Sequence, residues 1–318
     1  MENSNEVSKI SEVSELSEVR SGVARSKLVL PAGDWRLLID YLAQRFKHIA
    51  FEEHLARLTK GEYTDAHGAP YSAQSTYSAN NVVLYFRDVP IEARVPFDEV
   101  ILFQDDEILV ADKPPFLTVI PAGQHLHETL LVRLRKRTGL NNLVPMHRID
   151  RETSGLVLFT LNPATRGKYQ SMFEAKQIDK TYEAIAPFKP ELAYPLRYES
   201  RIEESPAFMQ MHEVAGAPNA VTQIELIEKN GALAKYLVKP ETGKKHQIRI
   251  HFCALGMPIV NDQIYPVLMP AGQDDYAKPL QLLAKEIRFI DPITNNVRHF
   301  VSPRSLKLAD INYLAAKQ

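Results

Sequence analysis

The stretch on which the fold and the chemistry depend lies at residues 146–155. It reads Met146-His147-Arg148-Ile149-Asp150-Arg151-Glu152-Thr153-Ser154-Gly155. An apolar run at 156–159 follows and is typical of a buried strand, and the Thr-Ser-Gly before it is typical of a turn. Asp150 stands between two arginines, whose positive charge favours an ionised carboxylate. Such a carboxylate can attack or abstract a proton, but the same pattern also fits a structural ion pair at the start of a strand.

The whole chain has 318 residues, 45% of them hydrophobic, and a formal net charge of −1. This length allows two domains, or one large domain with an appendage. A nucleic-acid partner would need locally concentrated basic residues, because the total charge offers no general attraction. The single cysteine, Cys253, excludes an intrachain disulfide and multi-cysteine metal clusters and fits a reducing compartment. No apolar run is as long as a membrane span, and the first residues do not resemble a signal peptide, so we expect a cytoplasmic protein without a membrane partner. We also expect a monomer.

The N-terminal part of the sequence predicts a tail and a small accessory domain. Residues 1–25 are rich in Ser, Glu and Val, which predicts a disordered tail or a short amphipathic helix. Residues 26–98 predict two helices followed by a hairpin. The first helix would begin at Asp34 as N-cap, the second would run from Phe51 to Leu58, and a strand would follow at 82–86. Prolines at 90 and 96 predict a linker over 88–98.

Residues 99–318 predict the main domain. Its expected strands lie at 100–103, 108–111, 156–161, 180–186, 222–227, 233–238 and 282–290, with a hairpin turn at Asp105-Asp106. One helix is expected from His127 to Thr138, a second behind Asn162-Pro163, and a third in the C-terminal half of residues 239–252. Strands outnumber helices and do not alternate regularly with them. This favours an α+β fold with a mixed, largely antiparallel sheet.

Several other chemistries fit the sequence poorly. His246 and His251 are five residues apart, so they do not share a helix face as a zinc pair would, and we expect no metal. Ser154 lacks the Gly-x-Ser-x-Gly elbow of a serine nucleophile. Glycine patterns of phosphate loops and dinucleotide sites are absent. A carboxylate pair of Asp150 and Glu152, as in a glycosidase, stays open, although Glu152 is expected at a turn, pointing to solvent.

Two locally basic segments remain. They are Arg133 to Arg137 and Lys235 to Arg249, and each alone is more often a solvated face than a binding site. Together with Arg148 and Arg151 they could form one positively charged stripe along a cleft. Such a stripe is the electrostatic footprint of a phosphate backbone.

Three segments resemble the motifs of the RluA-type pseudouridine synthases. The first is His147-Arg148-Ile149-Asp150-Arg151-Glu152-Thr153-Ser154-Gly155-Leu156. The second is Lys180-Thr181-Tyr182-Glu183-Ala184, and the third is Gly243-Lys244-Lys245-His246-Gln247-Ile248-Arg249-Ile250-His251. Further similarity lies at Asp112-Lys113-Pro114 and at residues 256–262, so the resemblance covers about 99–290 in family order. The chain departs from the family at Lys244-Lys245, where Arg-Thr is usual, and at Asn261, where Gly is usual.

The resemblance implies a pseudouridine synthase fold and an isomerase that needs no cofactor. It implies that Asp150 is catalytic, that Arg249 pairs with it, and that Tyr182 lies against the target base. It also implies that Arg148 fills the space vacated when a uridine leaves its stack. The residues expected to contact RNA are Arg148, Arg151, Lys180, Lys244, Lys245, His246, Arg133, Lys136 and Arg137. The accessory domain resembles, faintly, the αL RNA-binding motif of many relatives.

The sequence therefore predicts an RNA pseudouridine synthase that acts on uridines in structured rRNA or tRNA, with base flipping, and with RNA as its partner. The alternatives are a non-catalytic RNA-binding or RNA-folding protein on the same fold, and a nucleoside or glycoside hydrolase.

Overall fold

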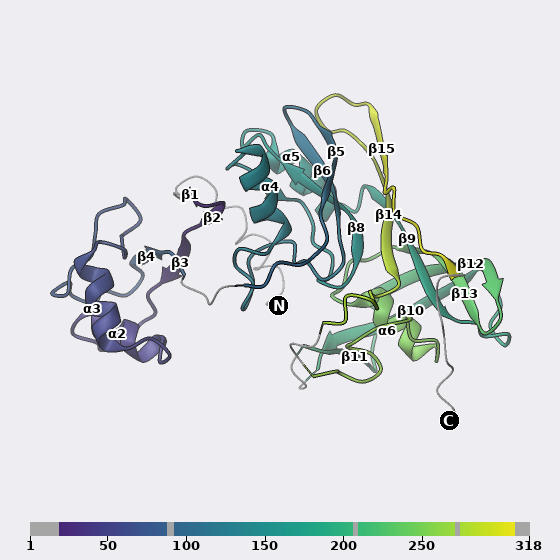
Figure 1. Ribbon diagram of the computed structural model, residues 1–318, viewed down its shortest axis with the longest axis horizontal. Coiled ribbons are helices and arrows are strands. Elements are labelled where there is room, and N and C mark those ends of the chain that lie inside the picture. The colour runs from purple at the N-terminus through teal and green to yellow at the C-terminus, as the bar shows by residue number, and fades with distance from the viewer. Residues whose placement is uncertain (1–18, 88–91, 206–208, 271–273, 309–318) are drawn as a thin grey trace. The chain divides into compact units, whose positions relative to one another are not determined.

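Two units of different architecture make up this chain, Met1–Glu92 and Ala93–Gln318 (Figure 1). The structure is a computed structural model that describes residues 19–87, 92–205, 209–270 and 274–308. Residues 1–18, most of the predicted tail, and part of the predicted linker lie outside the described residues. No helix among the described residues is long and apolar enough to cross a membrane.

The first unit contains short strands and two helices. Its strands are β1 (Val19–Arg20), β2 (Val23–Ala24), β3 (Ser26–Val29) and β4 (Val82–Tyr85), and its helices are α2 (Leu38–Arg45) and α3 (Phe51–Thr59). β1 pairs with β2, so residues 19–24 are a small hairpin and not part of a tail. β4 pairs antiparallel with β3, which precedes both helices. The predicted hairpin after the helices is therefore wrong, because the partner of the 82–85 strand comes from far earlier in the chain.

The start of α2 also differs from the prediction. Its N-cap is Leu37 and not Asp34, because the Asp40 carboxylate accepts a hydrogen bond from the Leu37 backbone N–H at 3.3 Å. An acidic side chain in the first turn satisfies one of the free backbone donors there, so a polar N-cap is not required. The apolar face of α2 packs in one cluster of buried residues with Leu58 of α3 and Val83 of β4.

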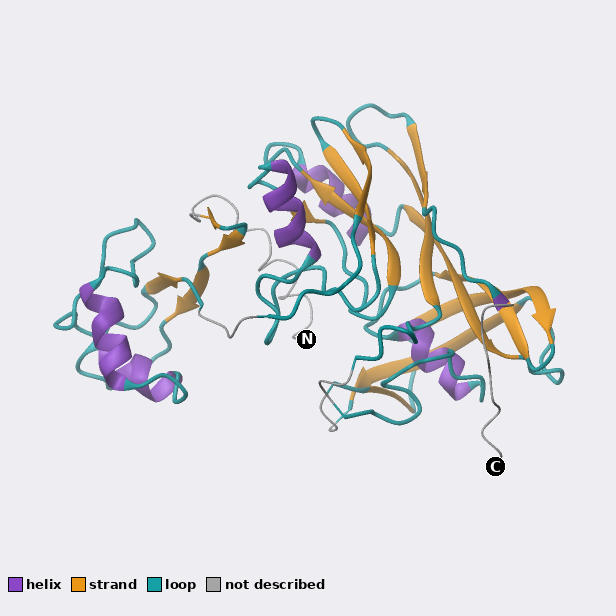
Figure 2. Ribbon diagram, viewed as in Figure 1, coloured by secondary structure: helices purple, strands orange, loops and turns teal. Residues whose placement is uncertain are grey.

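The second unit is built on one 11-stranded sheet, and strands predominate over helices in it (Figure 2). The strand order is β11-β10-β12-β13-β9-β14-β8-β6-β5, with β15 beside β14 and β7 beside β8. The strands are β5 (Val100–Gln104), β6 (Ile108–Lys113), β7 (Val144–Pro145), β8 (Ser154–Thr160), β9 (Ile178–Pro187), β10 (Leu196–Glu204), β11 (Met211–Val214), β12 (Ala220–Asn230), β13 (Leu233–Pro240), β14 (Leu282–Ile290) and β15 (Val297–Val301). Within the described ranges every pair is antiparallel except β14 with β8. The predicted mixed, largely antiparallel α+β fold is confirmed.

The helices of this unit are α4 (Leu130–Thr138), α5 (Arg166–Glu174) and α6 (Gln247–Ala254). α4 starts later than predicted, because the Thr129 hydroxyl caps it by accepting from the Val132 N–H at 3.3 Å. α5 also starts later, because the Asn162 side chain accepts from the Ala164 N–H and closes a turn before the helix. The third predicted helix is confirmed as α6, with Ile248 and Phe252 buried.

Gly155 is required where β8 and β14 run side by side. The two strands pair in parallel there, with Ala284 opposite Gly155. Gly155 has φ +111°, and a Cβ at this position would lie 2.2 Å from the Ala284 carbonyl oxygen. Only glycine adopts this conformation and leaves room for such a close approach. Ser154 and Gly155 are the first residues of β8, so the turn predicted for Thr153-Ser154-Gly155 is wrong, and Gly155 fixes how the loop before β8 enters the sheet.

Candidate active site

The stretch that carries Asp150 is the connection between β7 and β8, residues 146–153. A completely buried lysine at the end of β6, Lys113, holds this connection through its Nζ, which donates to the carbonyls of Arg151 at 3.0 Å and Pro114 at 2.8 Å. On the other side the His147 Nε2 accepts a hydrogen bond from the Leu158 N–H at 3.2 Å. Burial lowers the pKa of His147 to about 3, so the imidazole stays neutral and keeps this acceptor. The loop is therefore attached at both ends to the buried strands.

Arg249 of α6 is the centre of the site, and its side chain is completely buried. Its Nε and Nη2 donate to the two carboxylate oxygens of Asp262 at 2.8 and 2.7 Å. Its Nη1 donates to Asp150 Oδ2 and to Glu152 Oε2, both at 3.2 Å. Burial opposes the charge on Arg249, but the hydrogen bonds and charges of the three carboxylates raise its pKa above the ordinary value. One buried guanidinium thus joins three acidic side chains.

Asp150 is ionised in this environment, and its side chain is 24% exposed. Burial favours the neutral carboxyl, but His246, Arg249 and Lys113 outweigh burial and hold the pKa of Asp150 below its usual value. Arg148 and Arg151, the neighbours in sequence, do not supply this effect. Arg148 is exposed, and Arg151 is bonded to Asp274. The expectation that the flanking arginines hold Asp150 ionised is therefore wrong.

Glu152 is also not where the sequence suggested. It is buried beside Arg249, although a solvent-facing turn position was expected. The Nη1 of Arg151 lies 3.6 Å from Glu152 Oε1, and both Nη atoms of Arg151 contact the Asp274 carboxylate. Its guanidinium is therefore engaged within the protein.

Tyr182 and Lys180 lie two residues apart on β9 and so face the same side of the sheet. Tyr182 packs against two buried apolar clusters, one of which contains Ile149. Burial, and then the charge of Asp150, raise the pKa of Tyr182, so the phenol stays protonated. Lys180 lies with its Nζ 5.1 Å from the centre of the Phe173 ring, and burial lowers its pKa. The two side chains line a narrow crevice with His147 and Glu286.

The third motif presents a buried histidine and two exposed lysines. His246 has φ +56°, its Nδ1 bonds the Tyr265 hydroxyl at 2.9 Å, and its Nε2 lies 3.9 Å from Asp150 Oδ1. Burial lowers the pKa of His246, although Asp150 opposes this. Lys244 and Lys245, just before it, are exposed.

Gln247 fixes this loop by using all of its hydrogen-bonding capacity. Its Nε2 donates to Val221 O and Thr222 Oγ1, and its Oε1 accepts from Thr242 Oγ1 and Lys244 N.

Comparison with known proteins shows to which family this chain belongs. Residues 107–254 match the model of the RNA pseudouridylate synthase family. The chain is 31% identical over 211 residues to tRNA pseudouridine synthase C of Vibrio cholerae, covering 61% of this chain and 86% of that protein. The chain belongs to the RluA-type RNA pseudouridine synthases. This confirms the predicted family and makes the protein an enzyme that isomerises uridine in RNA.

Two further relatives agree with this assignment. The synthase is 29% identical over 218 residues to the dual-specificity RNA pseudouridine synthase RluA of Pasteurella multocida, covering 64% of this chain and 92% of that one. The fold is similar to that of human RNA pseudouridylate synthase domain containing 1, with a TM-score of 0.55, 22% identity, and coverage of 67% of this chain and 86% of that chain. The structural likeness supports the fold, and the sequence likeness supports the family.

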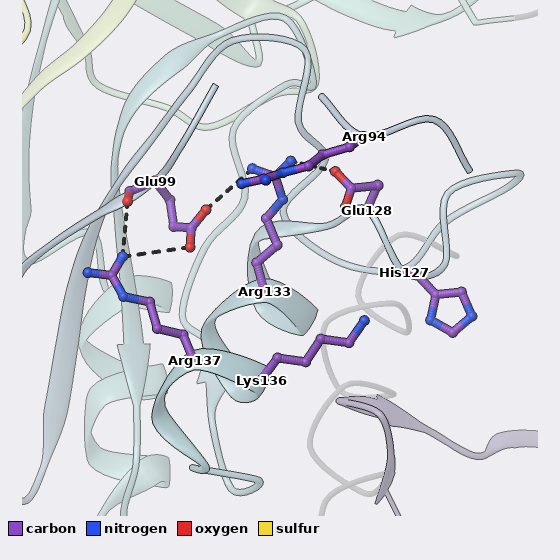
Figure 3. Close-up of a pocket in the computed structure, with 7 residues that line it drawn as sticks. All are labelled: Arg94, Glu99, His127, Glu128, Arg133, Lys136 and Arg137. Carbon is purple, nitrogen blue, oxygen red and sulfur yellow. Dashed lines mark hydrogen bonds and ion pairs between the residues drawn. The ribbon is translucent and has the colours of Figure 1, made fainter. Parts of the chain in front are cut away.

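The predicted RNA contacts on α4 lie apart from this network. Arg133, Lys136 and Arg137 line a separate pocket with no residue of the Asp150 cluster among its lining side chains (Figure 3). Arg133 is only 9% exposed and bonds Glu128, Glu99 and two backbone carbonyls. The structure thus brings together Asp150, Arg249, Tyr182 and His246 of the synthase, and leaves the basic residues of α4 elsewhere.

Sequence reasoning missed three residues of the site, Lys113, Asp262 and Tyr265. The first two lie in segments that resembled the family, Asp112-Lys113-Pro114 and residues 256–262, but no chemical role was attached to them. Tyr265 had no signal in the sequence, because its contact with His246 depends on the loop after α6. Within the described ranges, no group of three or more His, Cys, Asp or Glu side chains could hold a metal ion.

Proposed function

We propose that Asp150 is the catalytic carboxylate of this synthase. The observation that carries this proposal is the contact of its Oδ2 with the fully buried Arg249 Nη1 at 3.2 Å. An ionised carboxylate that is still 24% exposed can reach a substrate sugar. The isomerisation breaks the C–N bond between ribose and base, turns the base and joins it to the ribose through a carbon of the base. That base carbon loses its proton, and the freed base nitrogen gains one. Asp150 serves either as nucleophile at the anomeric carbon or as base on the ribose.

Arg249 would keep Asp150 charged and aimed in this scheme. A guanidinium supplies a fixed fork of donors, and Asp262 occupies one side of the fork while Asp150 meets the other. Preorganised charge of this kind costs no reorganisation when the reaction occurs. The hydrolase alternative would use Asp150 and Glu152 as two separate carboxylates, but both bond the same nitrogen, Arg249 Nη1. This shared partner favours one reactive carboxylate with a buried supporting one.

Tyr182 would receive the target base. Its ring lies on the same side of β9 as Lys180, near the Asp150 charge, and stacking of a base on an aromatic ring contributes roughly 1–3 kcal/mol. Taking a uridine out of its stack costs a few kcal/mol. Arg148 is exposed beside Asp150, which suits a side chain that fills the vacated position in the RNA. Lys244 and Lys245 would contact phosphates, while Arg151 and His246 would act within the protein because their polar groups are engaged there.

The substrate we propose is structured tRNA or rRNA. One relative is named for tRNA and another for dual specificity, and both names support this substrate class. The single cysteine favours a cytoplasmic enzyme, and we propose that the enzyme acts as a monomer without a cofactor. We further propose that residues 26–98 form an accessory domain that helps to bind RNA.

The test is incubation of the purified protein with tRNA and rRNA from cells that lack it, followed by mapping of pseudouridines. The proposal expects new pseudouridine at defined positions of tRNA or rRNA. Binding without any pseudouridine would favour the RNA-binding alternative, and release of free uracil would favour the hydrolase.

A further inference from the structure

A second candidate site lies beside α4, on the synthase unit but outside the Asp150 network. It is a pocket of about 310 Å³, which is enough for a small ligand or a fragment of a larger one. It is lined by Arg94, Glu99, His127, Glu128, Arg133, Lys136 and Arg137 (Figure 3). We propose that this pocket binds a backbone phosphate of the RNA substrate, away from the target uridine. This rests on the proposed RNA substrate and adds a second contact to it.

The charge of the pocket favours an anion. Four cationic side chains face two carboxylates, which leaves an excess of two positive charges before any contribution of His127. Glu99 and Glu128 are both held by Arg133, whose Nη1 and Nη2 also donate to the carbonyls of Phe97 and Val95. Glu99 is also ion-paired with Arg137, at 3.8 Å, so both carboxylates have cationic partners within the wall of the pocket. Arg94 is paired with Asp98, which leaves Lys136 and the outward side of the Arg137 guanidinium as the positive charge at the edge of the pocket.

Lys136 and Arg137 are suited to meet a phosphate. Lys136 is exposed, and in Figure 3 its amine points into the space between Arg133 and His127. Arg137 is 52% exposed, and its Nη1 donates to the Glu99 carbonyl at 3.2 Å and lies 3.8 Å from the Glu99 carboxylate. Both contacts use Nη1, so they set the direction of the guanidinium and leave Nε and Nη2 for a ligand. A guanidinium held in place with free donors matches the oxygens of a phosphate better than a mobile one.

A purely structural role explains only part of this arrangement. Cations in the last turn of a helix offset its partial negative charge, and Arg135, Lys136 and Arg137 occupy that turn of α4. That role needs neither the pocket nor Arg133, which is buried and bonded to both carboxylates. An acidic protein segment would also meet the charge, but the substrate of this family is RNA, which presents phosphates over a long surface.

The pocket is separate from the chemistry. The apolar side of α4, with Leu130, Leu131 and Leu134, packs in the cluster that contains Ile149. The three α4 residues that line the pocket, Arg133, Lys136 and Arg137, are not part of that cluster. A phosphate bound there cannot touch the reacting atoms. It would therefore raise affinity for long RNA without changing the turnover of bound substrate.

The test compares two double variants that each remove two exposed cations. Lys136→Ala/Arg137→Ala removes the edge of the pocket, and Lys229→Ala/Arg288→Ala removes exposed charges from β12 and β14 that do not line it. Binding is measured over a range of salt concentrations with transcripts of whole tRNA and rRNA and with a short uridine-containing hairpin. Matching thermal midpoints ensure that both variants are folded. Lys136→Glu, a change of one exposed side chain, repeats the test if the double variant does not fold.

We expect the pocket variant to bind whole transcripts about tenfold more weakly. A plot of the logarithm of its binding constant against the logarithm of salt concentration should have a slope that is less negative by about one to two. Its binding of the hairpin and its kcat on saturating RNA should match the wild type, and the control should behave as the wild type throughout. Unchanged affinity for whole transcripts, or an equal loss on the hairpin, overturns the proposal. Loss of binding to polyglutamate with no loss for RNA also overturns it and assigns the pocket to an acidic protein. If the wild type makes no pseudouridine, the proposed function fails, whatever these affinities are.

Discussion

Arg249 and Asp262 are joined by two parallel hydrogen bonds, Nε to Oδ2 at 2.8 Å and Nη2 to Oδ1 at 2.7 Å. Asp262 is itself fixed, because its Oδ1 accepts from the backbone N–H groups of Ile264 and Tyr265 at 2.8 and 3.0 Å. This pairing uses two of the three guanidinium nitrogens and turns the third, Nη1, toward Asp150. Asp262 therefore positions the arginine that positions the carboxylate.

Asp262→Asn should reduce kcat roughly 100-fold, since a small misplacement of a catalytic group has effects of this size. RNA affinity should stay unchanged, because Asp262 is 1% exposed and does not face the substrate. Steady-state turnover and RNA binding are measured together. The control is Asp291→Asn, because Asp291 is equally buried and bonded to Arg298 but lies away from the site. Equal losses of turnover in both variants would show that only stability had changed.

Arg249→Lys should lower turnover by at least about tenfold while RNA affinity changes little. A lysine keeps one positive charge but cannot bond Asp262 and Asp150 at the same time, as the guanidinium fork does. Single-turnover kinetics with saturating RNA separate the chemical step from binding. If kcat and affinity fall to the same extent, Arg249 acts mainly as an RNA contact and the proposed pairing is wrong.

Gly155→Ala should destabilise the protein by about 1–3 kcal/mol or more. The added Cβ would meet the Ala284 backbone at 2.2 Å, and a φ of +111° strains any residue with a side chain. Gly167→Ala on α5 is the matched control, because a Cβ there meets nothing within 4 Å. That change should stabilise by roughly 0.5–1 kcal/mol. Urea unfolding of both variants tests this, and equal stabilities would contradict the proposed close approach of β8 and β14.

Acid should destabilise the fold partly through His251. Burial lowers the pKa of His251 from 6.5 to about 4, and its ring bonds Ser200 and Thr222. Between these two values the unfolded chain binds the proton and the folded chain does not. The free energy of unfolding therefore falls as pH falls through this window.

In the unsubstituted protein His251 should make the free energy of unfolding fall by up to about 1.4 kcal/mol per pH unit between pH 6.5 and about 4. His251→Gln should remove this pH dependence. Circular dichroism with urea, repeated from neutral to acid pH, follows the sheet. His299→Gln, which changes an exposed histidine of β15, should leave the slope as in the wild type. An unaltered slope in His251→Gln would mean that this histidine is not kept neutral by the fold.

The sequence predicts the buried strands of this fold well, because runs such as Leu156–Phe159 are apolar on both faces. It does not predict β10, β11 and β15, because β10 is rich in charged residues, and β11 and β15 are short and are interrupted by polar side chains. It does not predict that β4 pairs with β3 either, because the register between distant segments leaves no local signal.

The residues of the site divide in the same way, into those that a local motif reveals and those whose partners are far away in the sequence. Asp150, Arg249 and Tyr182 could be found from their motifs. The burial of Glu152, however, depends on a contact with Arg249 across 97 positions of sequence, and local pattern suggested a turn open to solvent. The partner of Arg151, Asp274, is 123 positions away. Such pairings are set by the fold, so charge in the neighbouring sequence was a poor guide to charge around Asp150.

The most direct test of the central claim is pseudouridine formation by Asp150→Asn on tRNA and rRNA from cells that lack this protein. Asn keeps the size of the side chain and can still bond Arg249, so RNA binding should remain as in the wild type. Asp291→Asn serves again as the control and should retain activity. The account predicts that Asp150→Asn forms no pseudouridine at any position that the wild type modifies. Measurable pseudouridine made by this variant would contradict the assignment of Asp150 as the catalytic residue.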